Sequence, residues 1–350
     1  MARRPRTVGD VGERGLIAHI QATAARSRLG DVGQIGDDAA VLSPAGGASG
    51  SGRAAVVSTD LLVEGTHWRD RHLKAAQLGW RALVANLSDI AAMGAKPAWF
   101  TLGLAMPPSQ PLDWFRGLMK GLSDAADVFE CPLIGGDLVR SSVPTIAITV
   151  GGLCRGRGPI RRSAARAGQT IFVTGDLGRA ALALRILDGQ WPARLPPLIR
   201  RTIVERHIRP IPRIREGALL GQLRGLGAMM DVSDGLVSDL QRICEQSGVG
   251  AEIDLDALPV HPSVRGACAK AGLDARLVAA ASGEEFELLF TSPLPESWLR
   301  TVLPQDLGVK AIGQITPGRE IRWFSRGDTV DLDPKAVYDH FSQGGGPARR

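Results

Sequence analysis

The sequence lacks the features that identify several large classes of protein. It has no apolar run approaching the roughly 18 residues that suggest a membrane span. Its basic start, residues 1–6, is not followed by the apolar core of a signal peptide. We therefore expect a cytoplasmic protein with no membrane partner. The sequence has four cysteines: Cys131, Cys154, Cys244 and Cys268. No two of them are close enough in the sequence for a zinc or redox motif. We expect them to be reduced thiols, mostly buried.

The common phosphate-binding loops are missing as well. No lysine directly follows a glycine, which excludes a Walker A loop. The pattern Gly-x-Gly-x-x-Gly is absent, which excludes both the dinucleotide fingerprint and the kinase glycine loop. There is also no His-Glu-x-x-His zinc motif. A nucleotide enzyme with this sequence must bind phosphates in a less common way.

Aromatic residues are scarce, whereas positive charge is plentiful. The net charge is +6 and the pI about 9.5, yet aromatic residues make up only 5% and there is a single tyrosine. The positive charge comes mostly from arginines scattered along the chain, which is typical of a solvated basic surface. Nucleic-acid binding normally requires denser basic patches and aromatic side chains for stacking on bases. We therefore expect no nucleic-acid partner.

Short β-branched runs alternate with longer helical patterns, which predicts an α/β fold. Strands are expected at residues 54–60, 99–106, 144–153, 170–174, 228–232 and 286–291. Helices are expected at residues 75–93, 112–129, 178–187 and 236–247. The Gly- and Arg-rich stretch 155–158 indicates a domain junction. We therefore expect an N-terminal domain at 1–156, a C-terminal domain at 157–341 and a disordered tail at 342–350.

Five acidic clusters are the most informative feature of the sequence. Each is flanked by Gly, Ser or Thr, and we expect them at strand ends, where side chains converge at one edge of a sheet. Converging carboxylates repel one another unless hard cations lie between them, and oxygen ligands suit Mg²⁺. Because Mg²⁺ usually completes its shell with substrate phosphates, the clusters favour nucleotide chemistry. Taken singly, each would be only a turn or a helix cap. The clusters are Gly36-Asp37-Asp38, Ser58-Thr59-Asp60, Asn86-Leu87-Ser88-Asp89, Gly135-Gly136-Asp137 and Asp231-Val232-Ser233-Asp234-Gly235.

These clusters lie in segments that resemble the thiamine-monophosphate kinases of the PurM-like superfamily. The residue 86–97 segment and the histidine that follows Thr66 are specific to the kinases, whereas the shorter Gly-Asp and Asp-Gly pieces are shared across the superfamily. The resemblance implies a two-domain PurM-like α/β (α+β) fold. It also implies a homodimer in which the N-terminal sheets pair, with the site in a cleft between the two domains. The matching segments, in family order, are residues 35–40, 58–67, 85–97, 135–137, 231–236 and 282–288.

The resemblance implies a role for each matching residue. The Mg²⁺ ligands would be Asp38, Ser58, Thr59, Asp60, Asp89, Asp137, Asp231 and Asp234. ATP would contact Gly136, Asp137, Arg162 and Ser233. Thiamine monophosphate would contact His67, Glu284 and Tyr338. The sequence departs from the family in two places: Glu285 stands where aspartate is expected, and the segment before Tyr338 is one residue longer than usual.

The implied reaction is the ATP-dependent phosphorylation of thiamine monophosphate to thiamine diphosphate, by direct in-line transfer assisted by several Mg²⁺ ions. The acceptor is already a phosphate monoester, so neither a strong general base nor a covalent nucleophile is expected. One alternative is another PurM-like synthetase, of the aminoimidazole ribonucleotide or selenophosphate type. A selenophosphate synthetase should carry a reactive cysteine near its N-terminus, but the first cysteine here is Cys131. The other alternative is a non-catalytic nucleotide- or RNA-binding protein.

Overall fold

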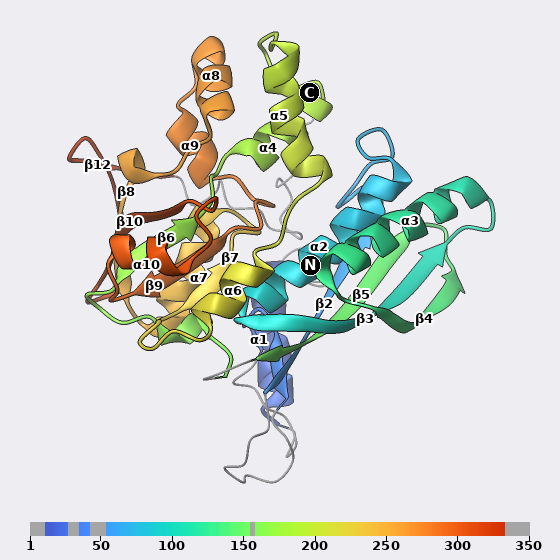
Figure 1. Cartoon of the computed structure of the whole chain (residues 1–350), viewed down its shortest axis with the longest axis horizontal. Coiled ribbons are helices and arrows are strands. Elements are labelled where there is room, and N and C mark those ends of the chain that lie inside the picture. Colours follow the sequence, from blue (N-terminus) through green and yellow to red (C-terminus); the bar gives the residue numbers. More distant parts are fainter. Residues whose placement is uncertain (1–10, 27–34, 43–53, 155–157, 333–350) are drawn as a thin grey trace, which may run out of the picture.

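Each half of the chain forms its own β-sheet, and the two sheets are joined by helices (Figure 1). The computed structural model describes residues 11–26, 35–42, 54–154 and 158–332. In spatial order, the five-stranded sheet comprises β1 (Ala40–Leu42), β2 (Ala55–Val63), β5 (Thr145–Cys154), β3 (Ala95–Met106) and β4 (Leu133–Arg140). The seven-stranded sheet comprises β12 (Asp328–Val330), β11 (Ile321–Ser325), β8 (Gly250–Asp254), β10 (Val309–Thr316), β6 (Thr170–Thr174), β9 (Leu288–Ser292) and β7 (Met229–Asp231). The structure confirms the predicted mixture of helices and strands.

Two long helices, α2 (Ala75–Ala92) and α3 (Leu112–Phe129), cover one face of the first sheet (Figure 1). The two helices approach each other closely because glycines lie where they cross. A Cβ atom at Gly121 would lie 1.9 Å from the Ala76 carbonyl oxygen, and one at Gly79 would lie 2.1 Å from the Leu118 oxygen. Only glycine fits at such contacts.

Helix α2 connects the two halves of the molecule. Most of its side chains are buried, because it packs on the first sheet and α3 on one side and contacts α6 and β7 on the other. Its last residues, Ala91 and Ala92, lie in a core with Phe172, Met229 and Phe290 of the second half. An interior helix of this kind can place side chains directly between the two halves.

The remaining helices lie mainly around the second sheet. Helices α4, α7, α8 and α9 share one large core with it, while α6 and α10 pack on its other face with the end of α2. None of the described helices is long and apolar enough to cross a membrane. All four cysteines are free and buried, as predicted. The helices are α4 (Arg179–Leu187), α5 (Pro197–Ile208), α6 (Ile214–Leu220), α7 (Leu236–Ser247), α8 (Pro262–Ala271), α9 (Ala275–Ala280) and α10 (Glu296–Val302).

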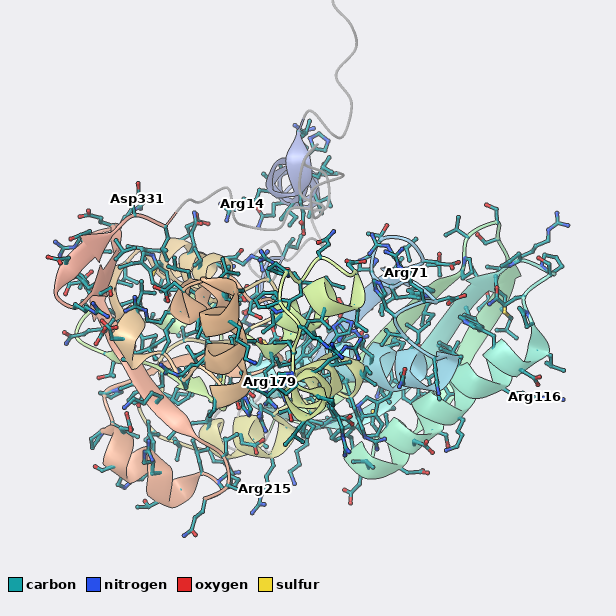
Figure 2. The ribbon with its side chains drawn as sticks, turned by 90° about the horizontal axis from the view of Figure 1, so that it is seen from above. Arg14, Arg71, Arg116, Arg179, Arg215 and Asp331 are labelled. Atoms are coloured by element: carbon teal, nitrogen blue, oxygen red, sulfur yellow. The ribbon has the colours of Figure 1, made fainter. Side chains whose placement is uncertain are left out.

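Helix α1 (Gly12–Ala24) lies outside both cores. It has no buried residue, and Figure 2 shows it, marked by Arg14, above the region where the two halves meet. Among the described residues, side-chain contacts link it to its surroundings: Gln21 donates to the Ile35 carbonyl at 2.8 Å, and Arg14 lies 3.5 Å from Glu245 on α7. The helix therefore covers the junction without belonging to either core.

The predicted elements are all present, with β6, α3 and α7 at the expected bounds. The sequence did not predict β1, β4, β8, β10, β11 or β12, nor α1, α5, α6, α8, α9 or α10. The most consequential of these is β4, because residues 135–137, expected at a strand end, lie within it.

Candidate active site

A cavity of about 1000 Å³ lies where the two halves meet, below α1. Its walls come from β2, from the cavity-facing side of α2, from the end of β7 and from residues 281–286. Eleven predicted site residues line it together: Asp38, Ser58, Thr59, Asp60, His67, Asp89, Arg162, Asp231, Ser233, Asp234 and Glu284. The structure therefore assembles residues that are almost 250 positions apart in the sequence (284 − 38 = 246).

Three carboxylates converge at one end of this cavity. Asp38 precedes β1, Asp89 lies on α2 and Asp231 ends β7, and one oxygen of each lies within 4.8 Å of the others. Burial raises the pKa of Asp231 to about 7, with a further contribution from Asp38. Burial also raises the pKa of Asp89 well above its usual range, and the charges of Asp60 and Asp231 add to this effect. A hard cation would relieve this strain, and the oxygen-only donor set fits Mg²⁺.

Serine hydroxyls orient two of these carboxylates. Ser58 donates to Asp89 at 2.6 Å, while Ser88 and Ser233 donate to the two oxygens of Asp231 at 2.5 and 3.1 Å. Hydrogen bonds to the ionised form favour the charged carboxylate and so oppose the effect of burial. The serines therefore hold the acidic side chains ready for a cation.

The expectation that the acidic clusters mark strand ends is wrong for three of them. Asp60 lies in the middle of β2, Asp89 lies on a helix and Asp137 lies inside β4. The carboxylates instead meet where β2 and α2 of the first half face the end of β7 in the second. Asp60 is tolerated within a strand because the side of β2 that carries it faces the cavity.

Arg162 supplies positive charge to the carboxylate cluster. Its Nε and Nη2 atoms donate to the two oxygens of Asp38 at 3.0 and 2.6 Å, and Nη1 donates to the Gly36 carbonyl at 2.9 Å. A planar guanidinium binds a carboxylate in this bidentate way, and it binds phosphate in the same manner. The pair also connects the start of the first half to the start of the second.

A second arginine, Arg242 on α7, was not predicted. Its Nη1 atom lies 2.5 Å from Asp234 and 3.2 Å from Asp239, and it lines the cavity. Burial raises the pKa of Asp239 well above its usual range, with Asp234 as the next cause. The turn that presents Asp234 requires Gly235, whose φ of 107° lies in the left-handed region.

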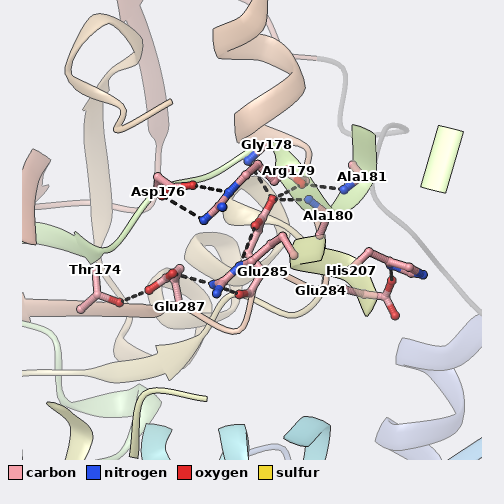
Figure 3. Close-up of polar contacts among 12 residues, drawn as sticks. Thr174, Asp176, Gly178, Arg179, Ala180, Ala181, His207, Glu284, Glu285 and Glu287 are labelled. Atoms are coloured by element: carbon pink, nitrogen blue, oxygen red, sulfur yellow. Dashed lines mark hydrogen bonds and ion pairs between the residues drawn. The ribbon is translucent and has the colours of Figure 1, made fainter. Parts of the chain in front are cut away.

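His67 and Glu284 also line the cavity, outside the cluster of three carboxylates. The Nδ1 atom of His67 accepts a hydrogen bond from the Val63 amide at 3.0 Å, so Nε2 carries the proton when the ring is neutral. Glu284 forms an ion pair with Arg81 of α2. Its Oε2 atom lies 3.7 Å from Nδ1 of His207, and Figure 3 shows these two side chains beside each other. Charged and hydrogen-bonding groups thus face the cavity outside the carboxylate cluster as well.

The segment that carries Glu284 is held from inside by the glutamates that follow it. Glu285 accepts hydrogen bonds from the Gly178 and Ala180 amides at 2.7 and 3.0 Å, which caps the start of α4 (Figure 3). Glu287 is fully buried and pairs with arginines 206 and 213, each at 2.6 Å. The longer side chain that replaces the expected aspartate at position 285 therefore has a structural role.

Two predicted residues that the structure describes, Gly136 and Asp137, do not line this cavity. Gly136 and Asp137 lie on β4, the outer strand of the first sheet, which β5 and β3 separate from β2. The side chains of β4 are exposed along its whole length. Tyr338 lies outside the described residues.

The predicted motifs do not include the basic residues Arg81, His207 and Arg242, although all three line the cavity. Sequence analysis did not predict them, although one signal was present. Arg81, Ala85 and Asp89 follow one another at four-residue intervals, which places them on one face of a helix, and all three line the cavity. No comparable signal marked His207 or Arg242.

Comparisons with known proteins agree with this geometry. The model of the AIR synthase related protein N-terminal domain matches residues 36–154, and that of the C-terminal domain matches residues 166–324. The thiamine-monophosphate kinase of Synechococcus elongatus is 38% identical over 348 residues, covering 96% of this chain and 98% of that protein. That of Escherichia coli K12 is 37% identical over 337 residues, covering 95% and 98%.

Solved structures of thiamine-monophosphate kinases also match this chain over most of its length. AaThiL complexed with AMPPCP and TMP matches with a TM-score of 0.81 and 28% identity, over 97% of this chain and 100% of that one. Thiamine monophosphate kinase from Aquifex aeolicus matches with a TM-score of 0.77 and 27% identity, over 93% and 100%. Together with the full-length relatives, these matches show that the chain belongs to the thiamine-monophosphate kinase family of AIR synthase related proteins.

Proposed function

We propose that this protein transfers the γ-phosphoryl group of ATP to the phosphate of thiamine monophosphate, forming thiamine diphosphate and ADP. The observation that carries the proposal is one cavity whose wall holds both the three converging carboxylates and, away from that cluster, His67 and Glu284. Such a cavity can hold a nucleotide phosphate and a second, smaller anion in line. The names of the full-length relatives and the AMPPCP and TMP complex of AaThiL support this choice of substrates.

The residues that would hold Mg²⁺ are Asp38, Asp89 and Asp231, with Asp60 and Asp234 beside them on the cavity wall. Bound there, Mg²⁺ would offset the negative charge of the transferring phosphates. Ser58 and Thr59 offer further oxygen ligands from β2. Ser233 and Arg162 would contact the nucleotide. Transfer would be direct, because the acceptor phosphate is itself a competent nucleophile.

We also propose that the protein acts as a homodimer through its first sheet and that residues 1–156 and 157–341 are separate domains. The outer strand β4 supports the dimer, because an exposed strand edge bearing apolar side chains is a template for pairing. Gly136 and Asp137 lie on this strand, so a second copy paired there could bring them to the nucleotide end of its partner's cavity. The exposed apolar residues of β4 are Leu133, Ile134, Leu138 and Val139.

Mixing two inactive variants tests this shared site. If Asp137 acts in the partner's cavity, a dimer of one Asp89→Asn chain and one Asp137→Asn chain has one intact site. Random reassortment should then restore about a quarter of wild-type turnover. If the mixture remains inactive, Asp137 does not act across a dimer. Sedimentation as a monomer at micromolar concentration would also contradict the proposal.

Product analysis tests the proposed reaction. A kinase leaves the transferred phosphoryl group on the acceptor, whereas a PurM-like synthetase releases inorganic phosphate. We expect ADP and thiamine diphosphate in equal amounts, with no matching free phosphate. Phosphorus NMR separates the pyrophosphate linkage from free phosphate. One equivalent of phosphate per ADP, with thiamine monophosphate unchanged, would favour the synthetase alternative. Tight RNA binding without ATP turnover would favour the non-catalytic alternative.

A further inference from the structure

The part of the cavity wall near Glu284 contains a buried arginine. Its partners all belong to the other half of the chain. Arg81 lies on α2 and is only 2% exposed. It forms an ion pair with Glu284, donates from Nη1 to the His207 carbonyl at 2.8 Å, and lies over the Phe286 ring at 5.8 Å from its centroid. No other carboxylate is paired with it among the described residues. Glu284 is thus the counter-ion of this buried charge.

The backbone at Glu284 is held in an unusual conformation. Glu284 has a φ of 58° and Phe286 a φ of 53°, although side chains other than glycine rarely occupy the left-handed region. Such strain persists only where the surroundings enforce it, and it is concentrated at functional sites. Here Glu285 anchors the segment to the start of α4 (Figure 3), and Glu287 anchors it through two arginines. Glu284 is left facing the cavity.

The two sides of Glu284 have different surroundings. One oxygen is engaged by Arg81, while Oε2 lies 3.7 Å from His207 and the side chain is 40% exposed. His207 is buried, and burial, followed by the charge of Arg81, lowers its pKa to about 3, so the ring is neutral. Burial alone would raise the pKa of Glu284, but Arg81, through its positive charge and its hydrogen bond to Glu284, holds that pKa below its usual value. A fixed, ionised carboxylate with an accessible oxygen results.

We propose that Arg81 is a positioning residue for the acceptor: it holds Glu284 ionised and oriented so that the free carboxylate oxygen can bind the acceptor's cationic or N–H-bearing ring. This inference rests on the proposed function, because thiamine monophosphate carries both a thiazolium cation and an aminopyrimidine. Arg81 acts through Glu284 and does not touch the reacting phosphates. It should therefore affect binding of the acceptor and leave binding of ATP unchanged.

The steady-state constants of Arg81→Met and Arg81→Lys test the inference. We expect Arg81→Met to raise the KM for thiamine monophosphate roughly ten- to hundredfold, the usual effect of losing a charge-assisted contact. The KM for ATP should stay within about twofold. Arg81→Lys keeps the charge without the planar fork and should give an intermediate value. Arg209→Met is the matched control: Arg209 is exposed and stacks on Trp80, next to Arg81, at 3.8 Å but lies outside the cavity, so neither KM should change.

A double variant distinguishes a positioning role of Arg81 from a general disturbance of the folded structure. If Arg81 acts through Glu284, Arg81→Met combined with Glu284→Gln should be no worse for the acceptor than Glu284→Gln alone. Effects of the two changes that multiply, or equal rises in both KM values, would overturn the inference. If Arg81→Met does not fold, the same comparison is made with Arg81→Lys, and an unchanged acceptor KM in that variant also overturns it. A wild-type protein that turns over no thiamine monophosphate would instead refute the proposed function.

Discussion

Replacing Asp89 by asparagine should make the metal-free protein more stable and the enzyme inactive. Asp89 lies among Asp38, Asp60 and Asp231, and its buried carboxylate is costly to ionise without a cation. Asparagine has nearly the same shape but no charge. It therefore removes repulsion and desolvation from the folded state while also removing a ligand that a cation needs.

The structure sets the size of this effect. Two unit charges 4.8 Å apart repel by about 3.5 kcal/mol at an effective dielectric constant of about 20. Asparagine would still accept a hydrogen bond from Ser58, 2.6 Å from Asp89, but the change from a charge-assisted to a neutral bond offsets this by about 1 kcal/mol. Partial protonation of the cluster reduces the repulsion further, which leaves a net stabilisation of about 1–3 kcal/mol. For a chain of this size the melting temperature should rise by roughly 1–4 °C.

Thermal unfolding without Mg²⁺ measures the stability of the metal-free variant, and unfolding with Mg²⁺ measures whether the variant still binds the cation. Without metal, Asp89→Asn should melt above wild type. With millimolar Mg²⁺ and an ATP analogue, wild type should gain stability through ligand binding, whereas the variant should gain little. Asp306→Asn, an exposed carboxylate without an ion pair among the described residues, should behave as wild type in both conditions. A variant that melts lower than wild type without metal, or keeps its full Mg²⁺-dependent gain, would refute the reasoning.

Three further outcomes are expected. Arg162→Gln leaves Asp38 buried without its partner and should lower the metal-free unfolding free energy by about 3–5 kcal/mol in urea titrations; an unchanged midpoint would contradict the ion pair. Because the folded pKa of His207 is about 3, only the unfolded chain gains its proton between pH 6 and 4. Wild type should therefore lose about 1.4 kcal/mol per pH unit more than His207→Gln on acidification, and equal slopes would show that the ring is not buried neutral. Gly121→Ala should lower the melting temperature, because the new Cβ would clash with the α2 backbone, whereas Gly266→Ala on α8 meets no atom closer than 4.0 Å and should not; equal melting temperatures would contradict the helix crossing.

Local signals in the sequence predicted those elements whose ends are set locally. Helix α7 begins after Gly235 and ends at Gly248, which has a φ of 68°, and both glycines are visible as helix boundaries in the sequence. Helix α3 has a strong apolar face between Pro111 and Glu130, so its bounds were predicted correctly. In these cases the chain within a few residues of the helix contains the necessary information.

Strand β4 was missed because its stability depends on a distant neighbour. Its Gly-Gly-Asp sequence is typical of a turn. In the structure, however, Gly136 pairs with Leu102 of β3, and a Cβ there would lie 2.0 Å from the Leu102 carbonyl oxygen. The glycine permits close approach of two strands and does not form a turn. Only the pairing partner, some thirty residues earlier, distinguishes these two uses of glycine (136 − 102 = 34).

The acidic half of the site was predictable, whereas only Arg162 and His67 of its basic half were, and the reason is electrostatic. A metal site needs several carboxylates with fixed local geometry, so they occur in recognisable segments. The arginines that balance them need only reach the right place, and any element can supply them: Asp38 pairs with Arg162, Asp234 with Arg242 and Glu284 with Arg81.

Some of the arginines lie inside the molecule and not on its surface. The scattered arginines indicated a solvated basic surface, but Arg81 and Arg206 are 2% and 5% exposed, and each is paired with a carboxylate. A buried guanidinium must have such a partner, since its charge cannot be lost by deprotonation. In this chain part of the positive charge therefore lies inside the molecule, where it stabilises the acidic residues of the cavity and the segment that presents Glu284.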